Sequence, residues 1–200
     1  MSFFDYSIYI QILLISILAY FLGAIPFALV VSKLKGIDLR SQGSGNLGAT
    51  NVFRVMGGFY ALIVFLGDVL KAYIPTYLSI IAFENPFFHV GVGLVAVMAH
   101  TFTVFASFKG GKGVASSVGM LFALNPLVML IVFIVGIIII KITRYVSLVS
   151  IIGSILMPIL LFVFDSPIEY IYTVSFVSVF LIFRHRSNIK RLLNGTENKI

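Results

Sequence analysis

The sequence around residue 110 combines glycine and lysine with the start of an apolar run, a combination that can bind an anion. The segment SFKGGKGVASS, residues 107–117, places Gly110, Gly111 and Gly113 around Lys112. Glycine lets the backbone approach a ligand closely. A helix starting there would add unpaired N–H groups and its positive dipole end. We predict an anion-binding loop, flanked by Lys109. It is not a Walker A loop, because Gly113 follows Lys112 where Ser or Thr is required. The alternative is a glycine-rich turn whose lysine reaches the lipid headgroups.

A second polar segment, GSGNLGATNVFR at residues 43–54, offers neutral hydrogen-bonding groups and one guanidinium. Arg54 can hold a phosphate through two parallel N–H groups. Hydroxyl and amide side chains that could bind the rest of a ligand are Ser44, Asn46, Thr50 and Asn51. The alternative is a capped interfacial loop in which Ser or Asn begins a helix.

A third segment, FRHRSNIKRLLNGTE at residues 183–197, contains a candidate proton acceptor. His185 and Asn188 are three residues apart and therefore share one helical face. A neutral imidazole can accept a proton, so His185 could act as a general base that Asn188 orients. We assign Glu197 a structural role. The alternative is a basic anchor that binds headgroups.

Two ionisable residues, Asp68 and Lys71, lie three apart inside an apolar run. Such residues are costly in a membrane and are usually functional or paired. They can satisfy each other across one helical turn, so a structural pair is the favoured interpretation. His100 could reach the glycine segment from the membrane side, or it could be a hydrogen-bonded packing residue.

These segments require apolar helices to hold them. The chain is 60% hydrophobic and 10% charged, whereas soluble domains carry about 25% charged residues. A membrane-spanning helix needs roughly 20 mainly apolar residues. We predict one all-α integral membrane domain over residues 1–200. Its expected seven spans, one of them short, are 8–31, 59–82, 88–106, 114–124, 125–141, 145–164 and 168–183.

The distribution of charge predicts which side each connection faces. With the N-terminus outside, thirteen of the fourteen bases fall on the inner side, and the outer side holds Asp5, Glu84, Asp165 and Glu169. The positive-inside rule therefore favours a cytoplasmic C-terminus. All three polar segments then fall on the inner side, so we expect them to form one site. The tail also predicts an interfacial helix at about 185–194.

Composition excludes several classes of chemistry. The chain has no cysteine, which excludes disulfides, zinc–thiolate sites and a cysteine nucleophile. The N-terminus MSFFDYSIY carries an acid and no base, so we expect the first apolar run to be retained as a span. The net charge of +7 lies beside the spans, which indicates membrane lipids and anionic substrates as partners and not nucleic acid. We expect no metal and no cofactor, and nothing in the sequence defines an oligomeric state.

The three segments together resemble the motifs of the bacterial acyl-phosphate-dependent glycerol-3-phosphate acyltransferases, the PlsY family. GSGNLGATNVFR, FKGGKGVAS and RHRSNIKRLLNGTE stand in the family's order and near its spacing. The resemblance covers nearly the whole chain. One departure is visible, because the family commonly has a proline shortly after the histidine of the third span, where this chain has Thr103.

The resemblance implies transfer of an acyl group from acyl phosphate to the 1-hydroxyl of sn-glycerol 3-phosphate, the first acylation of phospholipid synthesis. It also implies a seven-helix protein of the bacterial inner membrane with its site facing the cytoplasm. Glycerol 3-phosphate would bind the loop Gly110–Gly113, and we assign the acyl phosphate to segment 43–54. His185 or the departing phosphate would accept the proton. An acyl-enzyme on Ser44 is a third option.

Two other functions compete with this interpretation. A transporter of small phosphorylated anions would suit the Asp68–Lys71 pair and the short helix, although the chain has no internal repeat. A non-catalytic membrane subunit could use the basic loops to bind headgroups. Exchanging Lys112 and Arg54 for each other would be tolerated in such a subunit but not in a shaped phosphate site.

Overall fold

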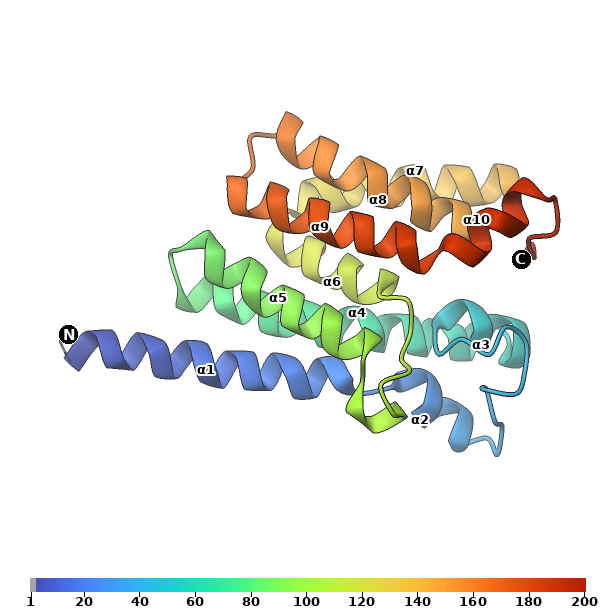
Figure 1. The fold of residues 1–200 in the computed structure, drawn as a ribbon, viewed down its shortest axis with the longest axis horizontal. Coiled ribbons are helices and arrows are strands. Elements are labelled where there is room, and N and C mark those ends of the chain that lie inside the picture. The colour runs from blue at the N-terminus through green and yellow to red at the C-terminus, as the bar shows by residue number, and fades with distance from the viewer. Residues whose placement is uncertain (1–2) are drawn as a thin grey trace. The chain divides into compact units, whose positions relative to one another are not determined.

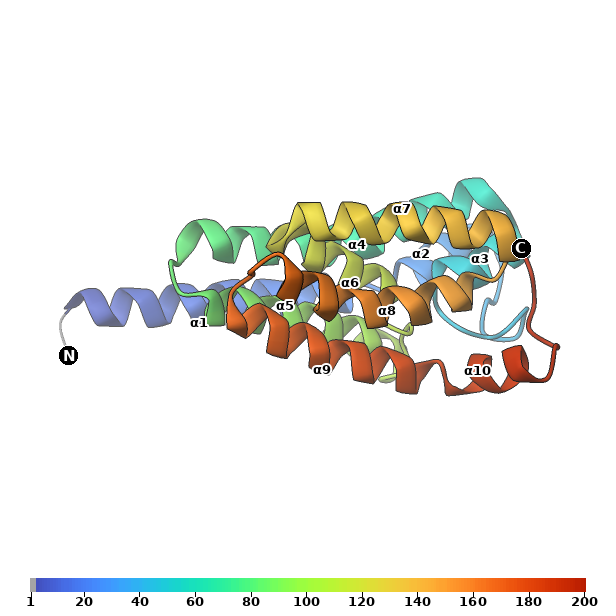
Figure 2. The same cartoon turned by 90° about the horizontal axis from the view of Figure 1, so that it is seen from above.

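The computed structural model describes residues 3–200, and all regular elements in that range are helices (Figures 1 and 2). The chain divides into two compact units, Met1–Leu124 and Asn125–Ile200, which we call unit 1 and unit 2. The sequence predicts a single domain over residues 1–200.

Unit 1 is built on four helices that run along one another, with α1 and α6 each contacting both α4 and α5 (Figure 1). The shorter helices α2 and α3 pack against each other and against the start of α4. Since α1 and α5 end where α4 and α6 begin, the polar connections gather at one end of the unit. The elements of unit 1 are α1 (Phe3–Ala24), α2 (Phe27–Lys33), α3 (Ala49–Met56), α4 (Gly58–Ala82), α5 (Pro86–Thr101), the 3₁₀ turn η1 (Val104–Ala106) and α6 (Val114–Leu124).

The predicted span 8–31 is not one continuous helix, which corrects the sequence-based prediction. It breaks between α1 and α2 at Ile25 and Pro26. Proline has no N–H for the helical ladder, and its ring disfavours helical geometry in the residue before it. At the break, the carbonyl oxygen of Ile25 accepts a hydrogen bond from the Lys71 side chain of α4.

Small residues let the helices of unit 1 approach closely. A Cβ at Gly119 of α6 would overlap the carbonyl oxygen of Val69 in α4. A Cβ at Gly23 of α1 would lie 2.6 Å from the carbonyl oxygen of Ala96 in α5. Helices in membranes associate through such close backbone contacts, because burial of apolar surface gives no advantage over lipid.

Unit 2 contains α7 (Pro126–Thr143), α8 (Val146–Val163), α9 (Ile168–Arg184) and α10 (Arg186–Leu193). The predicted break after residue 124 is present, because Asn125 caps α7 and Pro126 is its first residue. The Asn125 side chain accepts from Val128 N at 3.0 Å and donates to Ser166 Oγ at 3.0 Å. Helix α10 covers the residues predicted to form an interfacial helix and is bent by 57° from α9. Its place at the membrane surface stays a prediction.

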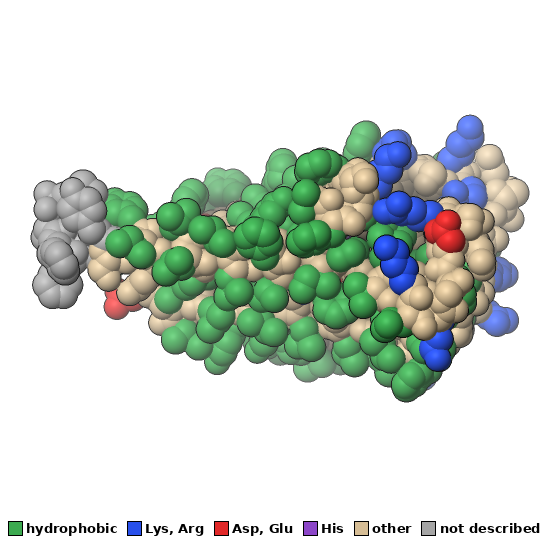
Figure 3. Space-filling model, turned by 90° about the horizontal axis from the view of Figure 1, so that it is seen from below, with side chains coloured by type: hydrophobic (Ala, Val, Ile, Leu, Met, Phe, Trp, Pro, Cys, Tyr) green, Lys and Arg blue, Asp and Glu red, His purple; other side chains and the backbone are tan. Residues whose placement is uncertain are grey.

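Among residues 3–200, five helices are long and apolar enough to cross a membrane, or six if α9 and α10 count as one bent span. They are Ser7–Ala24, Gly58–Ala82, Pro86–Ala106, Pro126–Thr143 and Val146–Val163. The short helix α6 is apolar, as predicted, but has only 11 residues. Figure 3, which faces α1, shows hydrophobic side chains over the helix and Lys and Arg gathered at one end. This pattern is that of an integral membrane protein.

Candidate functional site

The first two polar segments meet in unit 1, where they line one cavity of about 410 Å³. A cavity of this size can hold a small phosphorylated molecule. One wall comes from the loop before α3 and the other from the loop between η1 and α6. The lining residues are Arg40, Gly45, Asn46, Leu47, Ala106, Ser107, Lys109 and Gly110.

Arg40 is a cavity residue that the sequence analysis did not single out. Its side chain and that of Lys109 are exposed, and neither forms a salt bridge within residues 3–200. Two cations without carboxylate partners at one cavity produce a positive potential that attracts an anion. Its place in the sequence could have indicated Arg40, because it lies in a predicted inner connection only three residues before Gly43.

Asn51 holds the first segment in shape. Its side chain is 1% exposed, and its Oδ1 accepts a hydrogen bond from Ser44 N at 2.8 Å. Its Nδ2 donates to the carbonyl oxygens of Gln42 at 3.1 Å and Leu39 at 3.4 Å. The amide that the sequence assigns to substrate binding is thus occupied by the loop backbone. Asn51 organises the loop that carries Ser44 and Asn46.

Gly43 is required by the same arrangement. It has φ +61°, a conformation unfavourable for residues with a Cβ, and a Cβ there would overlap Asn51 Oδ1. The segment then continues to α3, whose first residue follows Gly48. Of the predicted binding side chains, Ser44 is exposed and Asn46, Thr50 and Arg54 are half-buried.

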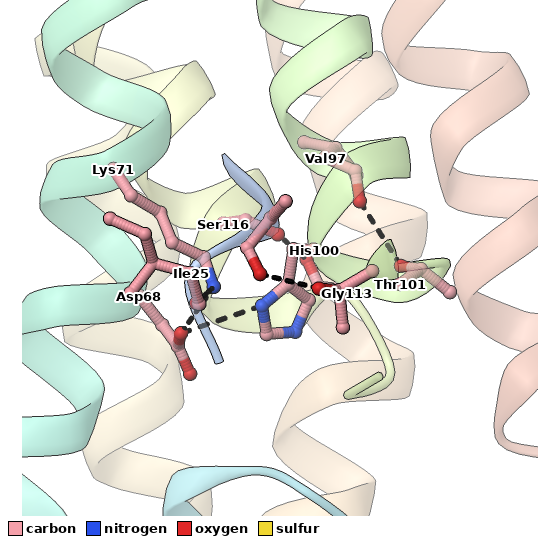
Figure 4. Close-up of polar contacts among 10 residues, drawn as sticks. Ile25, Asp68, Lys71, Val97, His100, Thr101, Gly113 and Ser116 are labelled. Carbon is pink, nitrogen blue, oxygen red and sulfur yellow. Dashed lines mark hydrogen bonds and ion pairs between the residues drawn. The ribbon is translucent and has the colours of Figure 1, made fainter. Parts of the chain in front are cut away.

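The second segment is held by backbone and hydroxyl contacts at both ends. At its start, Phe108 N donates to the carbonyl oxygen of Thr103 at 2.8 Å, and Gly110 N donates to that of Thr101 at 3.0 Å. At its end, Ser116 Oγ donates to the carbonyl oxygen of Gly113 at 3.0 Å (Figure 4). The predicted loop therefore leads directly into α6, with Lys112 half-buried at the turn.

Thr103, the position at which the chain departs from the family pattern, ties the end of α5 to α1. Its hydroxyl donates to the carbonyl oxygen of Ala24 and accepts from Phe105 N at 3.2 Å. It thereby caps η1 and also satisfies the last carbonyl of α1. A proline could make neither bond through its side chain.

Asp68 and Lys71 form the ion pair that their spacing predicts, with Lys71 Nζ 2.6 Å from Asp68 Oδ1. Lys71 also donates to the carbonyl oxygen of Ile25 at 2.7 Å, at the break between α1 and α2. His100 Nδ1 lies 3.4 Å from the same Asp68 oxygen (Figure 4). All three side chains are buried, so this cluster belongs to the interior of unit 1 and does not line the cavity.

In unit 2, His185 stands where α9 ends and α10 begins. It is 4% exposed, and its Nδ1 lies 2.8 Å from the carbonyl oxygen of Leu181. A carbonyl oxygen can only accept, so Nδ1 carries a proton and donates it. In the neutral ring Nε2 is then the nitrogen with a lone pair. This is the tautomer that a proton acceptor at Nε2 requires.

Glu197 is the centre of a polar cluster in unit 2. Its Oε1 accepts from Asn188 Nδ2 at 2.7 Å and from Ser147 Oγ at 2.9 Å, and its Oε2 accepts from Arg191 Nε at 2.6 Å. Burial alone would raise the pKa of the Glu197 carboxyl, but the hydrogen bonds from Asn188, Arg191 and Ser147 outweigh it and lower the pKa. The carboxylate therefore joins α8, α10 and the tail.

The structure holds His185 through Leu181, and Asn188 donates to Glu197. That Asn188 orients His185 stays a prediction from the sequence. Within unit 1 the structure joins the first two segments. That the third segment shares their site stays a prediction from the sequence.

Comparison with known proteins identifies relatives along almost the full length. A family model described as glycerol-3-phosphate acyltransferase matches residues 13–195. Proteins named glycerol-3-phosphate acyltransferase from Aquifex aeolicus and Fusobacterium nucleatum are 43% and 46% identical. The matches cover 94% and 92% of this chain and 98% and 95% of the relatives.

Two solved structures have the same fold. A crystal structure of PlsY, an integral membrane glycerol 3-phosphate acyltransferase in its glycerol 3-phosphate form, matches with a TM-score of 0.92 and 43% identity, covering 95% of this chain and 96% of that one. The lysophosphatidic acid form of PlsY matches with a TM-score of 0.89, 42% identity and 95% coverage of both chains.

Proposed function

The chain belongs to the glycerol-3-phosphate acyltransferase family, and we propose that it transfers an acyl group from an acyl phosphate to the 1-hydroxyl of sn-glycerol 3-phosphate. The products are 1-acyl-sn-glycerol 3-phosphate, which is lysophosphatidic acid, and inorganic phosphate. Relatives crystallised with glycerol 3-phosphate and with lysophosphatidic acid support the acceptor and the product. The reaction would be the first acylation step of phospholipid biosynthesis.

One observation carries the proposal: two glycine-rich segments far apart in the sequence line one cavity, with Arg40 and Lys109 at its wall. Both substrates carry a phosphate, and cations without carboxylate partners favour such ligands. We assign glycerol 3-phosphate to the loop Gly110–Gly113 with Lys112. We assign the acyl phosphate to segment 43–54 with Arg54, whose planar guanidinium can bind two phosphate oxygens.

Direct transfer is the mechanism that we favour, because an acyl phosphate is already activated. The hydroxyl oxygen of glycerol 3-phosphate bonds to the acyl carbon, the bond from that carbon to the phosphate oxygen breaks, and phosphate leaves. The hydroxyl proton goes to Nε2 of His185 or to the departing phosphate. Positioning two substrates in this way can lower the barrier by up to about 7–11 kcal/mol.

We further propose seven spans in a bacterial inner membrane, with the N-terminus outside and the cavity facing the cytoplasm. The count adds α6 and α9 to the five long apolar helices. In unit 1, every base except the buried Lys71 lies in α2, α3 or the connections at the cavity end. Bases are concentrated on the cytoplasmic side of membrane proteins, and an acyl tail could extend from there into the bilayer.

The test is an assay of the purified protein in detergent micelles with acyl phosphate and glycerol 3-phosphate. We expect release of phosphate and formation of lysophosphatidic acid only when both substrates are present. Acyl-CoA serves as the contrasting donor. Equal or faster acylation from acyl-CoA would overturn the assignment of the donor, and no acylation from either would overturn the proposed reaction.

A further inference from the structure

A buried row of polar side chains connects α4 with the second glycine segment. Asp68, Lys71 and His100 are 1%, 3% and 5% exposed. Lys71 and Asp68 form a close ion pair, and Lys71 also donates to Ile25 (Figure 4). This pair is already neutral overall. His100 is therefore not needed to balance a charge, and its position must have another reason.

That reason lies at the opposite edge of the imidazole. Nδ1 faces Asp68, whereas a Cβ added at Gly111 would overlap Nε2. A Cβ at Gly110 would overlap the carbonyl oxygen of His100 itself. The backbone of the glycine pair thus lies directly on this histidine, and the ring stands between a fixed carboxylate and the loop.

The same loop position touches the first segment. A Cβ at Gly111 would lie 2.9 Å from the carbonyl oxygen of Leu47, one of the residues that line the cavity. Gly111 is therefore enclosed between His100 on one side and segment 43–54 on the other. A displacement at this point would move the following residue, Lys112, and would also disturb the cavity wall.

We propose that His100 is a positioning residue that fixes the loop Gly110–Gly113, and with it Lys112, for the phosphate of glycerol 3-phosphate. In this role the Nδ1–H of His100 donates a hydrogen bond to the Asp68 carboxylate, 3.4 Å away, and this selects the tautomer in which Nε2 is an acceptor facing the loop. Lys71, which also donates to the carbonyl oxygen of Ile25, holds Asp68 in place. The identity of the phosphate ligand rests on the proposed function, whereas the contact between His100 and Gly111 does not.

Two amide variants separate this role from simple stabilisation of Asp68. The amide of Asn falls near the position of Nδ1, and that of Gln near the position of Nε2. His100→Asn therefore keeps the contact with Asp68 but loses the contact with the loop. His100→Gln keeps the contact with the loop but loses the contact with Asp68. We expect His100→Asn to raise KM for glycerol 3-phosphate about tenfold, with less change in kcat and in KM for the donor. His100→Gln should stay closer to wild type.

Hydrogen exchange gives a second readout that needs no catalysis. His100→Asn should speed amide exchange in residues 107–113, whereas His100→Gln should not. The matched control is His89→Asn, since His89 is equally buried in α5 but bonds the carbonyl oxygen of Phe83 instead. It should lower thermal stability and leave loop exchange and KM unchanged. Should His100→Asn fail to fold, Gly111→Ala disturbs the same contact and should raise the same KM and loop exchange.

The outcomes distinguish the inference from the proposed function. His100 does not position the loop if His100→Asn has a lower KM for glycerol 3-phosphate than His100→Gln. The same conclusion follows if both variants exchange the loop amides at the wild-type rate. If loop exchange changes as expected while the wild-type protein acylates nothing, the positioning stands and the proposed reaction fails.

Discussion

The first polar segment, 43–54, and the C-terminal segment, 183–197, each contain a buried asparagine, but the bases around the two asparagines are used differently. Asn51 bonds only backbone groups of its own loop, and the cavity beside it holds two cations with no salt bridge within residues 3–200. Asn188 instead shares the Glu197 carboxylate with Arg191. One region therefore leaves positive charge for an anionic ligand, and the other uses a base to hold its own fold.

The largest expected effect concerns the one residue of the C-terminal segment to which we assign chemistry. If His185 accepts the hydroxyl proton, His185→Ala should lower kcat by about 10²–10⁴-fold. Steady-state phosphate release measures it. Arg186→Gln is the matched control, because Arg186 is the exposed neighbour that packs on the Phe183 ring. It should turn over near the wild-type rate. Near-normal turnover in His185→Ala would assign the proton to the departing phosphate.

The next effect tests whether Glu197 holds the fold. Glu197→Gln keeps the shape but loses the charge that three donors share, so it should lower the free energy of unfolding by about 1–3 kcal/mol at neutral pH. Folding lowers the pKa of Glu197. The carboxylate therefore contributes its full stabilising free energy above the pKa of the unfolded state, and this stabilisation is lost as the pH falls through the pKa of the folded state.

Thermal unfolding in detergent at neutral and acidic pH measures this difference. The difference in melting temperature between wild type and Glu197→Gln should become smaller when the pH is lowered below the ordinary pKa range of carboxyl groups. Lys190→Gln, an exposed base on the same helix α10, should melt like wild type at both pH values. A gap that stays constant with pH would mean that the charge of Glu197 is not what joins the tail to α8 and α10.

A third change addresses the contrasting asparagine. Asn51→Ala leaves Ser44 N and the carbonyl oxygens of Leu39 and Gln42 without a partner, which should cost about 1–3 kcal/mol in folding or loop order. Because the loop forms the cavity wall, KM for the donor should rise as well. Gln42→Ala removes only an exposed side chain and should change neither. Wild-type melting and KM in Asn51→Ala would mean that the loop holds its shape without Asn51.

The helices were predictable from sequence to different degrees, for physical reasons. Hydropathy locates apolar runs well, since burial in lipid depends on composition. Hydropathy averages over neighbouring residues, however, so the prediction treated α1 and α2 as one continuous span across Pro26. The break after Leu124 was predicted because Asn125 and Pro126 give two start signals together.

The site was less predictable, because partners depend on contacts that spacing does not give. The two glycine segments could be singled out from residue types alone, and the structure brings them to one cavity. That they bind an anion together with Lys112 stays a prediction. The use of Asn51 by carbonyl groups nine and twelve residues away could not be predicted. The approach of His100 to the glycine segment was one of two predicted options, and the structure places the ring against Gly111. Arg40 was missed because it precedes the glycines and matches no local pattern.

The smallest expected effect tests the unpaired cations of the cavity, which are the other half of the comparison. Arg40→Gln and Lys109→Gln each remove one exposed charge beside the cavity. Each should raise KM for the phosphorylated substrates by about two- to fivefold at low salt, and this increase should shrink as added salt screens the charges. Lys33→Gln removes an equally exposed charge from α2, outside the cavity lining, and serves as the control. If all three variants shift KM alike, the cations act only through net charge. A shift confined to Arg40 and Lys109 would place the anion at the cavity, where charge without a carboxylate partner remains for the ligand.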